Sequence, residues 1–324
     1  MNKLQSIMKG HKKKKHEKVL IIDVYNLMFR TVNYAFKDSP IPKLQNSLLL
    51  TTDEKEINKI NEEISKQESI HFGFFKYLFV TNIQMFARKF RPTKLIMAID
   101  TDNYWRKDIY PEYKGKRKAA RQKSAVPYEK FWPIFNPFIK EFEDVLSNVY
   151  FLSKPRCEAD DFIGVLCKEE FSNVEFINVS TDGDFHQLGQ HPNYKQYNPM
   201  TKKMVTNINP KKDLFIKILM GDSGDNIPGV KDRCGVVTAT KMVNEGLDKA
   251  FEDESVKANF DRNKQLIDLS MVPQKYKDEI LECYRNYPIT PFKKRNVWNF
   301  MLNHRLKNIA ENINEFSSLF ENLD

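Results

Sequence analysis

The order of apolar and polar residues predicts a parallel β-sheet in the first two thirds of the chain. Short apolar runs at 19–22, 95–99 and 176–181 are separated by amphipathic segments, which is the strand–helix rhythm of a parallel sheet. Continuous apolar runs are typical of strands that are buried on both faces. We therefore expect an α/β fold with a central, mainly parallel sheet.

Residues 37–69 and the segment after about residue 207 depart from this rhythm. Residues 37–69 are polar, carry two prolines and then have the pattern of a charged helix at 52–66, so we expect an insertion at the periphery of the sheet. Residues 70–90 place aromatic and apolar side chains at helical spacing, and core packing is the favoured interpretation of these aromatics. The segment after about residue 207 is helical and contains no convincing strand.

The chain therefore divides into three predicted parts. Residues 1–18 form a flexible basic tail, residues 19–206 the α/β domain, and residues 207–324 a helical domain. The tail has no apolar segment behind it and is not a secretory signal. No apolar stretch approaches the length that crosses a membrane, so we expect no membrane partner.

Charge and cysteine content narrow the class of protein. The net charge is +9, with 52 Lys and Arg residues and a pI of about 9.1, which favours an anionic partner, most commonly nucleic acid. The four cysteines include no C-x-x-C pair and have no histidine at zinc-ligand spacing. Reduced thiols and a cytoplasmic location are the expected consequence.

Acidic residues cluster at the ends of the predicted strands. Asp23, Asp100 and the pair Asp182 and Asp184 each follow an apolar run, and the carboxyl ends of parallel strands are where α/β sheets bind ligands. Two further clusters, at 158–161 and 222–225, contribute Glu158, Asp160, Asp161, Asp222 and Asp225. So many like charges need cations to neutralise them. Carboxylates are the ligands that Mg²⁺ prefers, and two such ions suit phosphodiester hydrolysis.

Each of these acids alone has a simpler explanation. An Asp after a strand is often a helix N-cap or a turn former. For Asp161, at the start of a predicted helix, we favour capping slightly over metal ligation. The combination of so many strand-end acids in one half of the chain is what points to a metal site.

A basic segment lies between the second and third acidic clusters. Residues 106–123 contain eight basic and two acidic residues with interleaved aromatics, a composition suited to holding a single nucleic-acid strand. Because the segment follows a strand-end Asp, we expect it to overhang the metal site. The alternative is a solvated basic helix.

Five motifs in order resemble the 5′-nuclease (flap endonuclease) superfamily, and within it the ribonucleases H of T-even bacteriophages. They are IDVYNLMFR from Ile22, YKGKR from Tyr113, EADD from Glu158, STDGD from Ser180 and GDSGDNIPG from Gly221. The resemblance implies a PIN-like 5′-nuclease domain with a basic arch at 101–135. It also implies a helical DNA-binding domain with a degenerate helix-hairpin-helix.

The resemblance also implies roles for residues. Asp23, Asp100, Glu158 and Asp160 would hold one Mg²⁺ ion, and Asp182, Asp184 and Asp225 a second, with Asp222 near it and Mn²⁺ as a substitute metal. Lys114 and Arg117 would contact the scissile phosphate. The expected nucleic-acid contacts are Arg30, Arg106, Tyr110, Lys116, Arg121, Lys231 and Arg233.

The activities implied are 5′-to-3′ exonuclease, flap cleavage and RNase H activity, removing RNA primers and adjacent DNA from lagging-strand fragments. The implied partners are branched or flapped DNA, RNA–DNA hybrid, a single-strand DNA-binding protein and a sliding clamp. The protein would act as a monomer, in the host cytoplasm if it is phage-encoded.

The hairpin departs from the family pattern. Where the family usually has Gly-Val-Pro-Gly-Ile-Gly-Pro-Lys-Thr-Ala, residues 229–239 retain one hairpin glycine, gain a residue and have Val237 in place of the Lys. Tight hairpins use glycine to bring backbone N–H groups against phosphate. Lys231 and Arg233 are therefore expected to supply these contacts.

Two other functions compete with this interpretation. A catalytically silent nucleic-acid-binding subunit would be expected to lack some acids, and none is missing. A PIN-type endoribonuclease acting on single-stranded RNA would not need the GDxxD motif at Gly221 or the basic helical region after it.

Overall fold

A central sheet organises the molecule, and its strands confirm the predicted apolar runs. The computed structural model describes residues 17–323, so nearly all of the predicted basic tail lies outside the described residues. Within them, the sheet contains β1 (Lys18–Asp23), β2 (Lys94–Ala98), β3 (Tyr150–Leu152), β4 (Glu175–Val179), β5 (Tyr194–Asn198) and β6 (Lys203–Met204). The strand order is β3-β2-β1-β4-β5-β6, parallel except for the antiparallel β5–β6 pair. The predicted mainly parallel α/β fold is confirmed.

The strands are buried on both faces, which explains their uninterrupted apolar character. In β1, Leu20 and Ile22 point into one core and Val19 and Ile21 into the other, and all four are fully buried. Side chains alternate between faces along a strand, so a strand that is covered on both sides needs apolar residues at every position.

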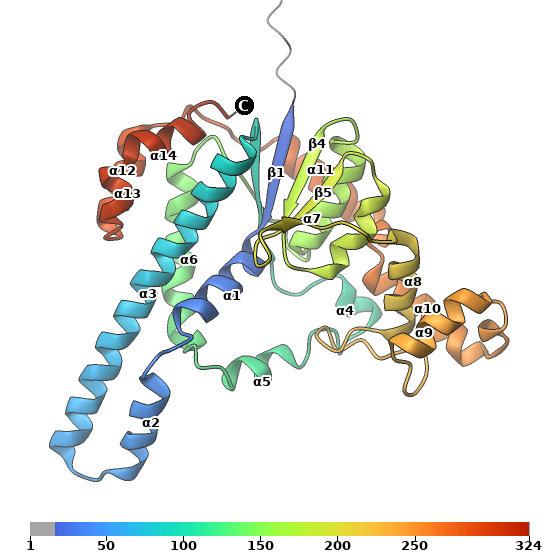
Figure 1. The fold of residues 1–324 in the computed structure, drawn as a ribbon, viewed down its shortest axis with the longest axis horizontal. Helices are drawn as coiled ribbons and strands as arrows, with labels where there is room; N and C mark the ends of the chain where they lie inside the picture. The colour runs from blue at the N-terminus through green and yellow to red at the C-terminus, as the bar shows by residue number, and fades with distance from the viewer. Residues whose placement is uncertain (1–16, 324) are drawn as a thin grey trace, which may run out of the picture.

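Helices supply the two covering layers and a separate helical region (Figure 1). They are α1 (Val24–Ala35), α2 (Ile41–Leu50), α3 (Glu54–Phe90), α4 (Arg106–Ile109), α5 (Arg117–Gln122), α6 (Tyr128–Val145), α7 (Ala159–Val165), α8 (Pro210–Met220), α9 (Val236–Glu245), α10 (Glu254–Ile267), α11 (Gln274–Arg285), α12 (Lys294–Asn303), α13 (Lys307–Glu311) and α14 (Ile313–Phe320). A π-helical turn (Leu166–Glu170) and 3₁₀ turns at Gly183–Gln190, Ala250–Glu252 and Leu269–Met271 complete the described elements. None of the described helices is long and apolar enough to cross a membrane.

The predicted insertion forms a helical arm. Helix α2 packs against the first half of α3, and the pair extends away from the sheet at the lower left of Figure 1. The helices expected at 52–66 and 70–90 are one continuous helix of 37 residues. The arm lies at the periphery of the sheet, and that residues 37–69 are an insertion stays a prediction.

The helices after residue 207 contribute to three different cores. Helices α8, α9 and α10 form a core of their own with Tyr113. Helix α11 packs with α7 against one face of the sheet, and α12 to α14 join α3 and α6 on the other. The predicted boundary at residue 206 stays a prediction, but residues beyond 269 pack directly with the sheet domain.

Candidate active site

The strand-end aspartates meet at the carboxyl edge of the sheet. Asp23 ends β1 and caps α1 by accepting a hydrogen bond from the Asn26 N–H at 2.9 Å. Asp100 follows β2 and accepts from the Ala159 N–H at 2.6 Å, and Asp182 accepts from the Asp184 N–H at 2.9 Å. The capping roles and the clustering therefore coexist, since each carboxylate retains a second oxygen for another partner.

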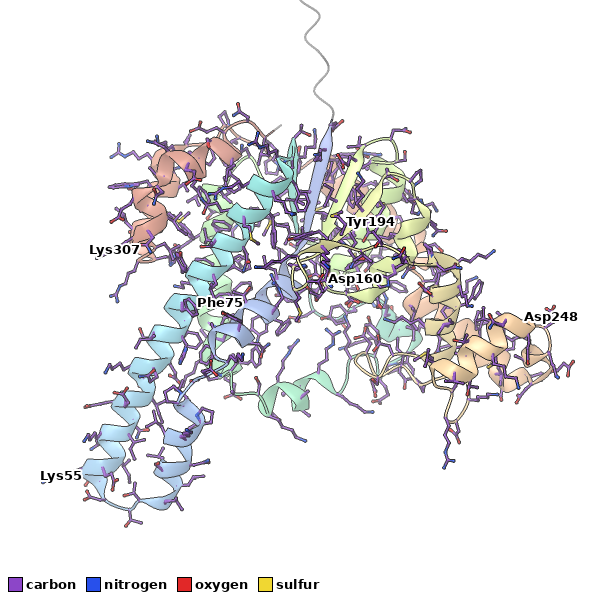
Figure 2. The ribbon with its side chains drawn as sticks, in the orientation of Figure 1. Lys55, Phe75, Asp160, Tyr194, Asp248 and Lys307 are labelled. Atoms are coloured by element: carbon purple, nitrogen blue, oxygen red, sulfur yellow. The ribbon has the colours of Figure 1, made fainter. Side chains whose placement is uncertain are left out.

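These carboxylates line one cavity of about 500 Å³ at the switch point of the sheet. Asp160, which follows β3, lies near the centre of the molecule where the strands end (Figure 2). The acids and bases that line the cavity are Asp23, Asp100, Asp160, Asp182, Asp184, Asp222, Asp225, Arg30, Lys114 and Arg117. The structure thus brings together seven of the nine predicted metal-binding acids.

Four of the aspartates carry charge that is poorly compensated. Burial raises the pKa of Asp160, and Asp182 and Asp23 raise it further. Burial and Asp100 raise the pKa of Asp23 in the same way. Burial also raises the pKa values of Asp100 and Asp182. Mutual repulsion of this kind is relieved by a bound cation.

Glu158 and Asp225 differ, because three bases of the arch, two at each acid, neutralise them. Burial alone would raise the pKa values of both carboxyls. Lys114 and Arg106 outweigh burial at Glu158 and lower its pKa. Lys114 and Arg117 do the same at Asp225. Lys114 pairs with Glu158, and its Nζ lies 3.9 Å from Asp225 Oδ2. Arg117 pairs with Asp225.

The backbone at Lys114 is held in an unusual conformation. Its φ is 57°, in the left-handed region, and its N–H donates to the Asp225 carbonyl at 2.8 Å. Non-glycine residues in this region store strain that the surroundings must offset. The Tyr113 hydroxyl helps to fix the turn, since it lies 3.1 Å from Glu158 Oε2 and 3.0 Å from Asp225 Oδ2.

Lys217 is part of the site and was missed by sequence reasoning. It lies in the last turn of α8, pairs with Asp184, and places its Nζ 3.0 Å from Asp222 Oδ2. The available signal was its position one turn before the GDxxD motif, where a helix carboxyl end favours a cation. Asp222 also accepts from the Gly224 N–H at 2.7 Å, so it is a turn former as well.

Arg106 corrects a predicted DNA contact, and Asp161 takes the capping role that was favoured for it and not the alternative role of metal ligand. Asp161 is fully buried and completes the capping box of α7, where its carboxylate accepts from the Glu158 N–H at 3.0 Å and from Trp105 Nε1 at 3.0 Å. Arg106 is 2% exposed, and its guanidinium donates to Asp161, Glu158 and the Leu266 carbonyl. Both carboxylate oxygens of Asp161 are therefore occupied by donors and are not available to a metal. Arg106 forms buried ion pairs that stabilise the fold and does not contact DNA.

Glu158 is 1% exposed and does not line the cavity. Its two carboxylate oxygens are taken by Lys114 and Arg106. Glu158 therefore holds Lys114 of the arch in place and is not among the carboxylates that line the cavity.

Arg30 lines the cavity, and part of its guanidinium has no hydrogen-bond partner among the described residues. The atoms concerned are Nε and Nη2, and both are buried. Burial lowers its pKa. Two buried donor atoms without an acceptor are costly, so Arg30 is a strong candidate for a phosphate contact.

Aromatic side chains extend from the cavity toward the arch. Tyr25 and Phe29 line the cavity, and Trp132 of α6 lies 5.7 Å and 6.0 Å from their rings. The Arg121 guanidinium lies over Phe29 at 4.8 Å and over Trp132 at 5.8 Å. Lys116 is exposed on the same arch. Together these groups form a half-exposed strip of rings and cations beside the acids.

The other predicted nucleic-acid contacts lie outside the cavity. Tyr110 packs against the core of α8–α10, with the Arg262 guanidinium 5.4 Å from its ring. The prediction that Tyr110 stacks on a base at the arch is therefore wrong in this structure. Lys231 and Arg233 are exposed in the loop between α8 and α9. This loop depends on Gly221 (φ 70°), where a Cβ would lie 2.4 Å from the Ile227 carbonyl oxygen.

The donor set fits a divalent metal, although the geometry is not preassembled. The cavity offers seven carboxylates and no histidine or cysteine, which is the chemistry that hard cations such as Mg²⁺ favour. Within residues 17–323, however, no group of three or more His, Cys, Asp or Glu side chains is arranged to hold an ion. Lys114, Arg117 and Lys217 instead pair with the acids.

The chain is similar to proteins that are named as nucleases. The chain is 28% identical over 275 residues to ribonuclease H of enterobacteria phage T4, covering 77% of this chain and 89% of that protein. It is 31% identical over 265 residues to a 5′-3′ exonuclease of Bacillus subtilis, covering 74% and 75%.

Solved structures agree with the fold. A flap endonuclease of bacteriophage T5, determined with DNA and metal ions, has a TM-score of 0.57 and 19% identity, covering 93% of this chain and 100% of that one. The T5 5′-exonuclease with bound zinc gives the same TM-score and identity over 90% and 99%. The model of the 5′-3′ exonuclease N-terminal resolvase-like domain matches residues 18–215. Because that match spans more than half of the chain, the protein is a nuclease that belongs to the 5′-3′ exonuclease family.

Proposed function

We propose that the protein is a Mg²⁺-dependent 5′ nuclease that cleaves flapped DNA and RNA–DNA hybrid, degrading from the 5′ end. The observation that carries this proposal is the set of four mutually repelling aspartates, Asp23, Asp100, Asp160 and Asp182, beside the unpartnered guanidinium of Arg30. Such a cavity suits cations together with a phosphate.

The acids divide between two ions in this proposal. Asp23, Asp100 and Asp160 would hold one, and Asp182, Asp184 and Asp225 the other, with Asp222 nearby. Mn²⁺ has the same preference for oxygen ligands and is the expected substitute. When bound, the ions would supply an activated water and charge stabilisation for the departing 3′-oxygen. Asp184, Asp222 and Asp225 would have to release Lys217 and Arg117 to take part.

The residues of the arch perform the electrostatic part of the reaction. Lys114 and Arg117 stay protonated, since the acids beside them raise both pKa values although burial opposes this. When phosphate enters, each can turn from its carboxylate toward the non-bridging oxygens, where positive charge is most effective as the transition state forms. Arg30, which lines the same cavity, would donate to the phosphate as well.

The substrate would be gripped on two sides. Tyr25, Phe29 and Trp132 offer ring faces for unpaired bases, with Arg121 and Lys116 for phosphates. Lys231, Arg233 and the open amino end of α9 would contact the duplex backbone. Removal of RNA primers and adjacent DNA from lagging-strand fragments is the replication task that this substrate choice implies. A monomer in the cytoplasm, working with a single-strand DNA-binding protein and a sliding clamp, completes the proposal.

The test is cleavage of a 5′-labelled flap duplex and of an RNA–DNA hybrid, with Mg²⁺ or with EDTA. Wild type should release short 5′ products from both substrates only with Mg²⁺. Asp182→Ala should bind the flap duplex and release nothing. Metal-independent cleavage, or full activity of Asp182→Ala, would remove the proposed site.

A further inference from the structure

A second groove lies away from the acids. It has a volume of about 690 Å³ and is enclosed by α3, the start of α6 and the segment from the end of α12 into α13. It shares no lining residue with the carboxylate cavity. Lys307, at its α13 rim, lies far from Asp160 in Figure 2.

The floor of this groove is apolar. Phe72 and Leu306 are nearly fully buried beneath it, at 6% and 2% exposure. Phe74 is 42% exposed, so it offers a ring face that the fold does not cover. An exposed aromatic side chain within a concave surface is a feature of binding sites.

The rim is positively charged. Four cations line the groove, Lys76, Lys130, Arg305 and Lys307, against a single acid, Glu68. Lys130 already satisfies Glu68, with Nζ at 2.7 Å and 2.9 Å from its two oxygens. Among the described residues, no carboxylate lies within ion-pair distance of the other three cations.

Lys76 shows that this charge is held in place. Its ammonium group can only donate, so at 3.1 Å it donates to His304 Nδ1, and His304 Nε2 therefore carries the proton that it shares with Glu141 at 2.8 Å. The neutral ring places no negative charge against Lys76, and Glu141 acts on the lysine only from beyond the ring. Burial lowers the pKa values of both Lys76 and His304, and Glu141 opposes this shift only in part.

We propose that this groove binds an acidic peptide segment of a partner protein that inserts an apolar side chain against Phe74. Carboxylates on the peptide would pair with Lys76, Arg305 and Lys307, and the apolar side chain would lie on the floor. A nucleic-acid strand would use the cations and could stack one base on Phe74, but the buried Phe72 and the aliphatic Leu306 offer it no further ring face, so the peptide accounts for more of the surface.

The test is fluorescence anisotropy of a labelled acidic peptide of Asp and Glu residues with two Phe residues. Phe74→Ser and Lys307→Glu should each weaken binding about fivefold or more, the loss of one apolar contact or one charge pair. The matched control is Lys257→Glu, an equal charge reversal on an exposed lysine of α10, which should leave peptide affinity within about twofold. Cleavage of the flap duplex should be unchanged in Phe74→Ser and Lys307→Glu, because neither residue lines the carboxylate cavity.

Two altered peptides separate the contributions. Replacing Asp and Glu by Asn and Gln should abolish the effect of Lys307→Glu, and replacing Phe by Ser should abolish the effect of Phe74→Ser. The proposal is overturned if the acidic peptide binds no more tightly than its amide version, or if neither variant weakens it. It is also overturned if single-stranded DNA, and not the peptide, depends on Lys307 and Phe74.

Discussion

Lys217 pairs with Asp222 across 3.0 Å and also contacts Asp184, so one ammonium group bridges two acids of the proposed second metal position. The lysine and a divalent cation would compete for the same oxygens. In the absence of metal, Lys217 neutralises part of the negative charge of these two acids.

Removing this lysine should therefore strengthen the response to metal. In Lys217→Met the two acids lose their cation, so the metal-free protein should be about 1 kcal/mol less stable, and the rise in melting temperature on adding Mg²⁺ should exceed that of wild type. Differential scanning calorimetry with EDTA and then with Mg²⁺ measures both. Lys195→Met, which breaks an ion pair with Glu175 on the sheet surface, is the control. An equal or smaller metal response in Lys217→Met would contradict this role.

Asp160→Asn should stabilise the metal-free protein while ending catalysis. Burial and like charges raise the pKa of Asp160, so the folded state binds its proton more tightly than the unfolded state does, and ionisation costs folding free energy above the unfolded-state pKa. The gain from Asn should be at least about 1 kcal/mol at pH 8 and should shrink as pH falls toward 5. Urea unfolding in EDTA at the two pH values measures it. A gain that grows on acidification would show the opposite sign of coupling.

Arg106→Met should destabilise the fold strongly. The substitution leaves Glu158 and Asp161 buried without their cation, and breaking a buried pair on one side costs about 3–5 kcal/mol. Arg285→Met, at an exposed pair with Glu170, should change stability by less than about 1 kcal/mol. Equilibrium urea unfolding compares the two variants. A near-neutral Arg106→Met with weakened DNA binding would support a substrate contact for Arg106 after all.

Arg121→Gln should weaken binding of flapped DNA more than binding of plain duplex. The guanidinium over Phe29 and Trp132 would be removed, and a cation–π contact at a solvent-accessible site contributes about 0.5–1 kcal/mol. Binding is measured by anisotropy in Ca²⁺, with Arg88→Gln, a surface arginine paired with Glu315, as control. Equal losses for the two DNA forms would argue that Arg121 acts only through its charge.

Lys231→Ala with Arg233→Ala should weaken duplex binding and reduce its salt dependence. For every phosphate that the double variant no longer neutralises, the slope of log affinity against log salt should fall by about 1. Titrations of duplex DNA at several salt concentrations test this. An unchanged slope would place the duplex elsewhere, and cleavage by the variant with saturating DNA distinguishes weak binding from a damaged site.

The sheet and its acids could be predicted because their signals are local. An apolar run that ends in Asp specifies both a buried strand and the edge at which its carboxylate lies, and this holds for Asp23, Asp100 and Asp182. The preference for Asp161 as a cap also agrees with the structure, in which it completes the capping box of α7.

The errors arose where tertiary packing decides. Arg106 looks like its basic neighbours in sequence, but the short helix α4 turns it inward between α7 and α10. Lys217 is ordinary in sequence, and only the end of α8 brings it to Asp184. Tyr110 lies on the segment expected to be the arch, but it faces the core of the following helices.

The unbroken course of α3 has a consequence for natural variation in length. At 37 residues it is a rod of about 55 Å, and its last turns are fixed against the sheet by Phe79, Ile83 and Phe86. Any insertion or deletion in its outer half rotates everything beyond it by about 100° per residue. Changes of about seven residues, close to two full turns, would keep α2 on the same side, so rotational phase, more than length, is what selection can hold constant in this arm.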